Sequence, residues 1–269
     1  MLVGVVNVTP DSFSDGGLYL DSHDAIMAGL ELSVQGAWMV DVGGESTRPG
    51  ASEVSIADEC ERVVPVVKGL ADSGVSVSID THKPEVAARA IEAGADAIND
   101  VTGFTNPEMI DLCAATGVGA IVMHMKGDPR TMQANPTYRD VVSEVGSFLL
   151  DRAQALEAAG VAPHSIVIDP GFGFGKTLEH NLELMNRLDE ICALGYPVML
   201  GTSRKSTLGE VSGQSDPMSR DVATAATTAL GFERGARLFR VHNVVASRDA
   251  LRIAAAIVDP QRWDEWQQD

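Results

Sequence analysis

One strand–turn–helix unit of the sequence decides the fold: residues 165–195 read SIVIDPGFGFGKTLEHNLELMNRLDEICALG. The run Ile166–Val167–Ile168 is β-branched and apolar at consecutive positions, which is typical of a parallel strand buried on both faces. A glycine-rich turn and a helical stretch over 178–194 follow, and Gly195 is the type of residue that ends a helix. This unit predicts a buried strand, a turn at its carboxyl end and a helix that packs back onto a parallel sheet.

The same unit recurs along the 269 residues. We expect strands at 2–7, 38–42, 75–80, 96–99, 119–124, 165–169, 197–202 and 238–242, and helices at 22–36, 58–73, 84–94, 107–116, 138–159, 178–194, 219–233 and 246–258. Alternating strands and helices in a chain of this length predict an α/β protein, a closed (β/α)8 TIM barrel. An open doubly wound sheet is the alternative. No linker or low-complexity stretch interrupts the series, so we expect a single domain over residues 1–269.

The composition indicates a globular protein of the cytoplasm. Hydrophobic residues make up 45% of the chain, and the formal net charge of −18 argues against nucleic acid and anionic membranes as partners. No apolar run reaches the roughly 20 residues of a membrane span, and the first residues lack the pattern of a secretory signal. The cysteines at 60, 113 and 192 are widely spaced, so we expect reduced thiols and a cytoplasmic location.

Polar side chains stand at the carboxyl end of every expected strand, where the active site of such a barrel lies. In chain order they are Asn7, Asp41 with 45–48, Asp80 with 81–83, Asn99 with Asp100, His124, Asp169, 202–206, and Arg240 with His242. Any one of them is equally well explained as a helix cap or a paired core residue. Because an unpaired buried polar group costs about 1–3 kcal/mol, polar ends on all eight strands predict a polar ligand.

The residue types at this end indicate two neighbouring sub-sites. The first suits a flat heterocycle with amide-like and guanidine-like edges, because carboxylates and amides accept and donate in one plane. It comprises Asp80, Asn99, Asp169 and Lys205. The second suits an oxyanion such as phosphate, since arginine favours bidentate anion contacts. It comprises Arg48, Arg240, His242, Ser46 and Thr47.

The sequence contains no nucleotide-binding P-loop and no zinc-binding motif. Residues 171–177 read GFGFGKT and look like a phosphate-binding P-loop, but Pro170 stands where that motif requires glycine. The histidines show no zinc-binding spacing.

The loops at 9–17 and 45–52 are candidates for mobile segments that close over the site, although each is also compatible with an ordinary surface loop.

These motifs, taken together, resemble those of the dihydropteroate synthases over about residues 2–258. The two long signatures are NVTPDSFSDGG at 7–17 and DVGGESTRPG at 41–50. Shorter matches follow in the same order at 78–81, 98–101, 123–125, 169–176, 203–206 and 240–242. The resemblance implies a barrel enzyme that joins a dihydropterin pyrophosphate to p-aminobenzoate and releases pyrophosphate.

The resemblance also implies a role for each matched residue. The pterin ring would be held by Asp80, Asn99, Met123, Asp169, Phe174, Lys205 and Arg240. Pyrophosphate would be bound by Asn7, Arg240 and His242, with Mg²⁺ on the side-chain oxygen of Asn7. The p-aminobenzoate site, where sulfonamides would compete, would be shaped by Phe13, Thr47, Arg48, Pro49, Phe172 and Ser206. The residues expected to act in catalysis are Lys205, Arg240, His242, Asp80 and, from the first loop, Asp15.

The expected reaction is a displacement in which bond breaking runs ahead of bond making, because the electron-rich pterin stabilises positive charge on the reacting CH₂. Mg²⁺, Arg240 and His242 would stabilise the leaving pyrophosphate. The weakly basic amine of p-aminobenzoate is neutral at pH 7 and needs no strong general base. The family implies a homodimer, formed through helices near the C-terminus.

Three positions depart from the family pattern, and two other functions are compatible with part of it. The departures are Phe104, Thr207 and Asn243, and they leave the affinity for p-aminobenzoate and sulfonamides undetermined. One rival is a methyltransferase that acts on methyltetrahydrofolate, which would not need the first-loop signature. The other is a non-catalytic pterin-binding paralogue, against which the intact Lys205, Arg240 and His242 argue.

Overall fold

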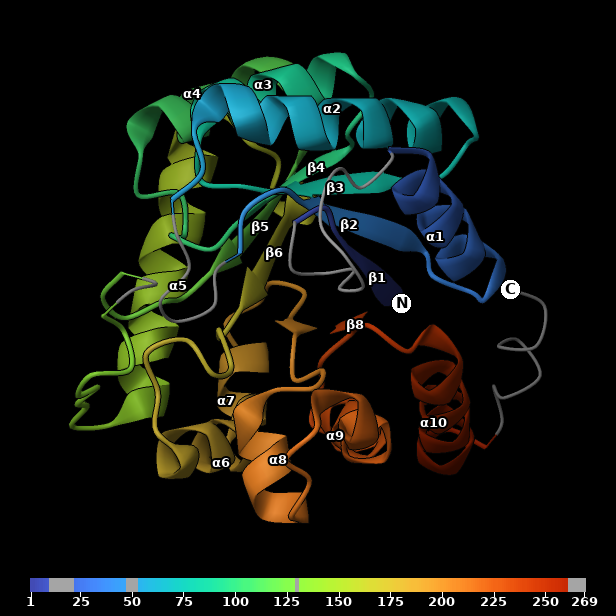
Figure 1. The fold of residues 1–269 in the computed structure, drawn as a ribbon. Coiled ribbons are helices and arrows are strands. Elements are labelled where there is room, and N and C mark those ends of the chain that lie inside the picture. Colours follow the sequence, from blue (N-terminus) through green and yellow to red (C-terminus); the bar gives the residue numbers. More distant parts are fainter. Residues whose placement is uncertain (10–21, 47–52, 129–130, 261–269) are drawn as a thin grey trace.

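The computed structural model describes residues 1–9, 22–46, 53–128 and 131–260 and contains eight parallel strands. The strands are β1 (Leu2–Asn7), β2 (Met39–Gly43), β3 (Val77–Asp80), β4 (Ala97–Asp100), β5 (Gly119–Met123), β6 (Ile166–Asp169), β7 (Met199–Leu200) and β8 (Leu238–Val241). They are paired in the order β6-β5-β4-β3-β2-β1-β8-β7 (Figure 1). Each apolar run of the sequence is thus a strand, as expected for segments buried on both faces.

The barrel closes between β6 and β7 through a short junction. Ile168 forms a single parallel bridge with Val198, and its backbone N–H donates to the carbonyl of Pro197 at 3.0 Å. β7 itself is two residues long, and the chain enters a turn at Ser203–Arg204 shortly after it. This closure confirms the predicted TIM barrel and excludes the open doubly wound sheet.

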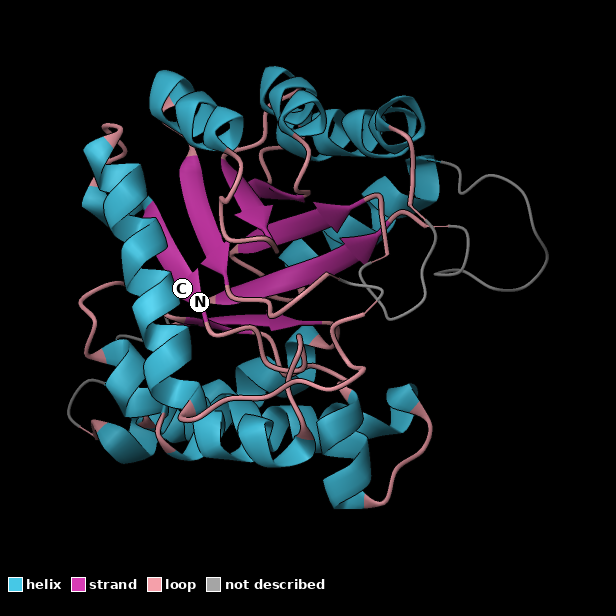
Figure 2. Cartoon of the chain, turned by 90° about the vertical axis from the view of Figure 1, so that its left-hand side faces the viewer, coloured by secondary structure: helices cyan, strands magenta, loops and turns pink. Residues whose placement is uncertain are grey.

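Helices lie above and below the strands and along one side of them (Figure 2). They are α1 (Ser22–Val34), α2 (Ile56–Asp72), α3 (Pro84–Glu92), α4 (Pro107–Thr116), α5 (Val141–Ala158), α6 (Leu178–Asn186), α7 (Leu188–Cys192), α8 (Ser206–Ser212), α9 (Asp221–Glu233) and α10 (Val244–Val258), with 3-10 turns η1 (Pro163–Ser165) and η2 (Pro217–Arg220). Capping residues explain several boundaries: Asn106 caps α4 through Glu108 N, and Gly117 ends that helix in the left-handed conformation. No helix among the described residues is long and apolar enough to cross a membrane.

The helices differ from the sequence prediction in two places. The helix expected over 178–194 is divided at Arg187, whose guanidinium is bonded to Asp140, Glu183 and Glu190. A further helix, α8, follows β7 between the strand expected at 197–202 and the helix expected at 219–233, where no helix is predicted. Both differences arise from short segments of only five to nine residues, in which the spacing of apolar residues carries little information.

Apolar side chains fill the barrel in two regions. Inside the strands a small cluster consists of Val3, Met39, Ala97, Ile121, Met199 and Leu238. A larger core lies between the strands and the helices and includes Val40, Val42, Ile79, Ile98 and Leu149. The carboxyl end of the barrel interior is instead polar, with Asp41, Ser78, Asn99 and Asp169 all buried.

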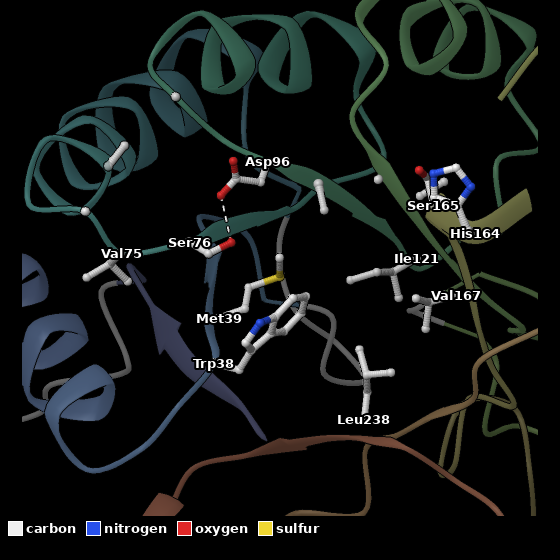
Figure 3. A pocket seen from close by; sticks show the side chains of 16 residues that line it. Trp38, Met39, Val75, Ser76, Asp96, Ile121, His164, Ser165, Val167 and Leu238 are labelled. Carbon is white, nitrogen blue, oxygen red and sulfur yellow. Dashed lines mark hydrogen bonds between the residues drawn. The ribbon is translucent and has the colours of Figure 1, made fainter. Parts of the chain in front are cut away.

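A cavity of about 650 Å³ opens at the opposite, amino-terminal end of the barrel (Figure 3). Its floor is the apolar inner cluster, and Trp38, Val167 and Leu238 point toward it. The carboxylate of Asp96 at its edge already accepts from Ser76 Oγ at 2.7 Å and from Val77 N at 3.1 Å. None of the predicted site residues that the structure describes lines this cavity. The ionisable groups converge at the carboxyl end, so the candidate site is there.

Candidate active site

Arg240 of β8 lies at the centre of the polar carboxyl end. Its Nε donates to Asp41 Oδ2 at 2.6 Å, and its Nη2 donates to Asp80 Oδ2 at 2.7 Å. Burial opposes the charge of the guanidinium, but Asp41 and Asp80 outweigh it and raise the pKa of Arg240 above its ordinary value. One arginine therefore links β8 to β2 and β3 across the barrel mouth and stays fully charged.

Asp41 is the buried carboxylate that holds this arrangement together. Its Oδ1 accepts from Ser78 Oγ at 2.6 Å, and its Oδ2 accepts from Asn99 Nδ2 at 3.0 Å in addition to Arg240. Sequence reasoning noted Asp41 at the strand end but did not predict it as a site residue. The signal was present, because a charged residue inside the otherwise apolar strand Met39–Gly43 must be paired when it is buried.

Asn99 is oriented by Asp41. A carboxylate only accepts hydrogen bonds, so the amide must turn its Nδ2 toward Asp41 and its Oδ1 the other way. That Oδ1 atom is buried and has no hydrogen-bond partner among the described residues. An unpaired buried acceptor costs free energy, and a ligand N–H at this position would remove the cost.

Asp80 and Asp169 supply two further buried carboxylates. Burial raises the pKa of Asp80 to about 7 against the effect of Arg240, and the neighbouring Asp41 adds to the rise. Burial also raises the pKa of Asp169, whose Oδ1 accepts from Gly171 N at 2.7 Å. Both groups stand at the ends of their strands, as predicted, and both can accept hydrogen bonds from a ring.

Lys205 and Phe174 lie against each other on this face. Lys205 precedes α8, and its Nζ lies 3.8 Å from the centroid of the Phe174 ring. Burial lowers the pKa of Lys205 to about 7, and Arg240 lowers it further, while Asp169 and Asp80 oppose the shift. The cation–π contact places an apolar surface and an ammonium side by side.

His242 is held by Ser203. The serine Oγ accepts from the backbone N–H of His242 at 3.1 Å and lies 2.9 Å from the ring Nδ1, to which it can donate. Burial and then Arg240 lower the pKa of His242 to about 3, so the ring is neutral at pH 7. With Nδ1 accepting from Ser203, the ring hydrogen resides on Nε2, which can donate to an anion.

The other predicted site residues differ in how far they are exposed at this end of the barrel. Met123 ends β5 and is buried, Asn7 ends β1 and is partly exposed, and Ser206 begins α8 and is exposed. Phe172 is 2% exposed, so its ring presents almost no surface to a ligand in this conformation. Phe13, Asp15, Thr47, Arg48 and Pro49 lie outside the described residues, and their roles remain predictions.

The three departures from the family pattern have structural roles of their own. Asn243 caps α10 through Ala246 N at 3.0 Å and donates to Asp221 at 2.8 Å. Thr207 accepts from Asn181 Nδ2 at 3.0 Å, and Phe104 is completely buried. Each of the three side chains thus contributes to the packing or hydrogen bonding of the fold.

The donor set at this end fits a magnesium ion only if a substrate supplies most of the ligands. Within the described ranges no group of three or more His, Cys, Asp or Glu side chains could hold a metal. Asn7 offers one amide oxygen at the barrel mouth. Mg²⁺ is commonly bound through one or two protein oxygens, phosphate oxygens and waters, so this residue is compatible with an ion that accompanies a pyrophosphate.

Comparisons with known proteins agree with this geometry. A family model described as "Pterin binding enzyme" matches residues 3–242. The dihydropteroate synthase of Mycobacterium leprae is 48% identical over 263 residues, which cover 95% of this chain and 92% of that protein. The Escherichia coli K12 enzyme is 42% identical over 258 residues, covering 95% and 90%.

Solved structures give the same result. The Yersinia pestis dihydropteroate synthase in a sulfonamide drug complex superposes with a TM-score of 0.90 at 39% identity, covering 96% of this chain and 94% of that one. The Xanthomonas albilineans dihydropteroate synthase in complex with 7,8-dihydropteroate superposes with a TM-score of 0.86 at 41% identity, covering 96% and 93%. The chain belongs to the dihydropteroate synthase family of pterin-binding enzymes.

Proposed function

We propose that this protein condenses 6-hydroxymethyl-7,8-dihydropterin pyrophosphate with p-aminobenzoate, giving 7,8-dihydropteroate and pyrophosphate in folate biosynthesis. The observation that carries the proposal is the unpaired Oδ1 of Asn99, a buried acceptor that points away from Asp41 because the Nδ2 of the same amide donates to that carboxylate. A reduced pterin has ring and amino N–H groups along one edge, and a row of acceptors is what such an edge requires. The relatives that cover most of this chain are named dihydropteroate synthases.

In this proposal the strand ends hold the pterin. Asp80, Asn99 and Asp169 accept hydrogen bonds from the ring, and Lys205 donates to it. Phe174 and Met123 pack against its faces, and Arg240 lies over it, fixed by Asp41 and Asp80. The carboxylates also stabilise positive charge that develops on the ring as the bond to pyrophosphate breaks.

The leaving pyrophosphate is stabilised by Arg240 and His242. The neutral imidazole donates from Nε2, and the permanently charged guanidinium offers bidentate contacts. Mg²⁺, held by Asn7 and phosphate oxygens, would supply further positive charge for the departing oxygens. The amine of p-aminobenzoate attacks while neutral, so no described residue needs to remove its proton before the bond forms.

The p-aminobenzoate site is proposed on the family resemblance for Phe13, Thr47, Arg48, Pro49, Phe172 and Ser206, with Asp15 acting in catalysis. Ser206 is the one of these that the structure describes as exposed, at the start of α8 and one residue from Lys205. Sulfonamides, which one solved relative binds, would compete for this site.

We also propose a cytoplasmic homodimer. The exposed surfaces of α9 and α10 carry large apolar side chains, including Val222 at 83% exposure and Ile257 at 73%. Exposed apolar groups on neighbouring helices favour association with a second copy. Cys60, Cys113 and Cys192 are all free, as suits a reducing compartment.

The test of the activity is direct. The protein is mixed with the dihydropterin pyrophosphate, p-aminobenzoate and Mg²⁺, and dihydropteroate is measured by chromatography together with released pyrophosphate. Formation of both products supports the synthase. Methyl transfer from methyltetrahydrofolate instead, or pterin binding without turnover, would favour one of the two rival functions. Sedimentation velocity measures the oligomeric state.

A further inference from the structure

A buried lysine lies next to the candidate site without being part of it. Lys176, in the loop between β6 and α6, is 3% exposed. Its Nζ donates to the carbonyl oxygens of Gly171 at 2.9 Å and Phe174 at 3.0 Å, and it lies 3.0 Å from Nδ1 of His124. An ammonium has three N–H groups, and these three acceptors satisfy them.

The loop from 171 to 176 is folded around this ammonium. Gly171 has a φ of 66°, and a side chain there would bring its Cβ within 1.8 Å of the carbonyl oxygen of His124. Gly175 has a φ of 62°, and its Cβ would come within 2.4 Å of the carbonyl oxygen of Lys126. The loop therefore packs backbone to backbone against the segment after β5, and two of its carbonyls face the Lys176 ammonium.

Both ends of this loop touch residues proposed to bind the pterin. Gly171, whose carbonyl Lys176 holds, donates its own N–H to Asp169 Oδ1 at 2.7 Å. Phe174, whose carbonyl is the second acceptor, packs its ring on the Lys205 ammonium at 3.8 Å. The geometry thus connects one buried ammonium to the positions of Asp169 and Phe174.

The charges around Lys176 agree with a role in holding the loop in place. The close contacts of Lys176 are carbonyl oxygens and a ring nitrogen. Burial lowers the pKa of Lys176 to about 7, and Asp169 opposes the shift. Burial lowers the pKa of His124 to about 3, which keeps Nδ1 able to accept. The Gly-Lys-Thr sequence resembles a phosphate-binding motif, but its lysine turns inward to bind its own loop.

We infer that Lys176 is a positioning residue for pterin recognition: by holding the carbonyls of Gly171 and Phe174, it sets the place of Phe174 against Lys205 and of the Gly171 N–H against Asp169. This inference rests on the proposed function, since it deepens the assignment of the pterin site. A purely structural lysine would change the amount of folded protein. A positioning lysine changes the affinity of the folded protein for pterin.

The test is Lys176→Met, which keeps the length of the side chain and removes the three donors. We expect KM for the dihydropterin pyrophosphate to rise about tenfold, as follows from leaving buried carbonyls unpaired next to the site. We expect KM for p-aminobenzoate to change by less than about twofold, because the one proposed p-aminobenzoate residue in this loop is Phe172, to which Lys176 donates no hydrogen bond and whose ring is 2% exposed. Lys68→Met is the control: the Lys68 ammonium pairs with Asp72 on the surface, where each side chain is 64% exposed, so both KM values should stay unchanged.

A double-mutant cycle separates the positioning role from a general one. If Lys176 acts through Phe174, then Lys176→Met should add little to the KM increase already caused by Phe174→Leu. Full additivity of the two effects, or an unchanged pterin KM in folded Lys176→Met, overturns the inference. If Lys176→Met does not fold, Lys176→Gln, which keeps two N–H donors, is judged by the same criteria.

A further measurement does not depend on the activity. Amide hydrogen exchange of residues 171–175 should become faster in Lys176→Met and stay as in the unchanged protein in Lys68→Met. If the unchanged protein binds no pterin, the proposed function fails, while this exchange still decides whether Lys176 holds the loop. Unchanged exchange in this loop would overturn the inference about Lys176 whatever the activity.

Discussion

Asp41 should be the residue on whose charge the site depends most. It is completely buried, and its two oxygens accept from Ser78, Asn99 and Arg240 at 2.6, 3.0 and 2.6 Å. Asp41→Asn keeps the shape and the acceptor for Asn99 and Arg240, and its new NH₂ group can donate to the Ser78 hydroxyl, which reverses the direction of that hydrogen bond. What it removes is the negative charge beside the buried guanidinium.

The expected cost follows from that loss. Removing one partner of a buried ion pair costs about 3–5 kcal/mol, and because Asp80 still contacts Arg240 we expect the lower end, about 3 kcal/mol, for Asp41→Asn. Asp41→Ala also leaves Asn99 and Ser78 without an acceptor, so the free energy of unfolding should fall by about 5 kcal/mol. Adding Arg240→Met to Asp41→Asn should recover part of the loss, because the unpaired charge is gone.

The assay is equilibrium unfolding in urea, followed by circular dichroism. Asp72→Asn is the control, since that carboxylate pairs with Lys68 on the surface, where each side chain is 64% exposed. An exposed pair of this kind contributes at most about 1 kcal/mol. The reasoning is refuted if Asp41→Asn loses no more stability than Asp72→Asn.

Three further predictions concern individual groups. Arg240→Ala should lower kcat by about 10² or more, because it removes an electrostatic donor to the leaving pyrophosphate; steady-state pyrophosphate release measures this, and a kcat within about threefold of the unchanged enzyme would contradict it. Asp169→Asn should weaken pterin binding at least about tenfold in titration calorimetry, since a buried acceptor becomes a donor, and near-normal affinity would refute the pterin assignment. His124 is neutral when folded, with a pKa of about 3 against 6.5 when unfolded, so it contributes stability above pH 6.5 that is lost as the pH falls toward 3. His124→Gln should therefore flatten the pH dependence of unfolding in that window by about 1.4 kcal/mol per pH unit, and the exposed His164→Gln should not.

The sequence was sufficient to predict the barrel because its signals are local. Most strands are apolar runs rich in β-branched residues, and Gly195, expected to end a helix, has a positive φ of 93°. The division of one helix at Arg187 was not predictable, because it coincides with ion pairs to Asp140 on another element. Long-range contacts of this kind leave no periodic pattern in the chain.

The same distinction applies to the site. The sequence predicted that polar side chains gather at the carboxyl ends of the strands, and the structure places Asp80, Asn99, Asp169, Arg240 and His242 there. Their pairing depends on which strands face each other across the barrel, and so the roles of Asp41 and Ser203 emerged only from the structure. Phe172 illustrates the reverse case, because a motif alone does not tell whether a ring faces the ligand or the core.

The junction between β6 and β7 has a consequence for how ligands affect the fold. One bridge at Ile168 and one hydrogen bond to Pro197 join these strands, whereas β1 and β2 are paired over five residues. The weakest strand junction of the barrel is therefore the one between β6 and β7. Asp169 lies on the β6 side of this junction, and Lys205 and Arg240 lie on the β7 and β8 side. A substrate that contacts residues on both sides stabilises this junction, so bound substrate should slow the separation of β6 from β7 more than that of any other strand pair.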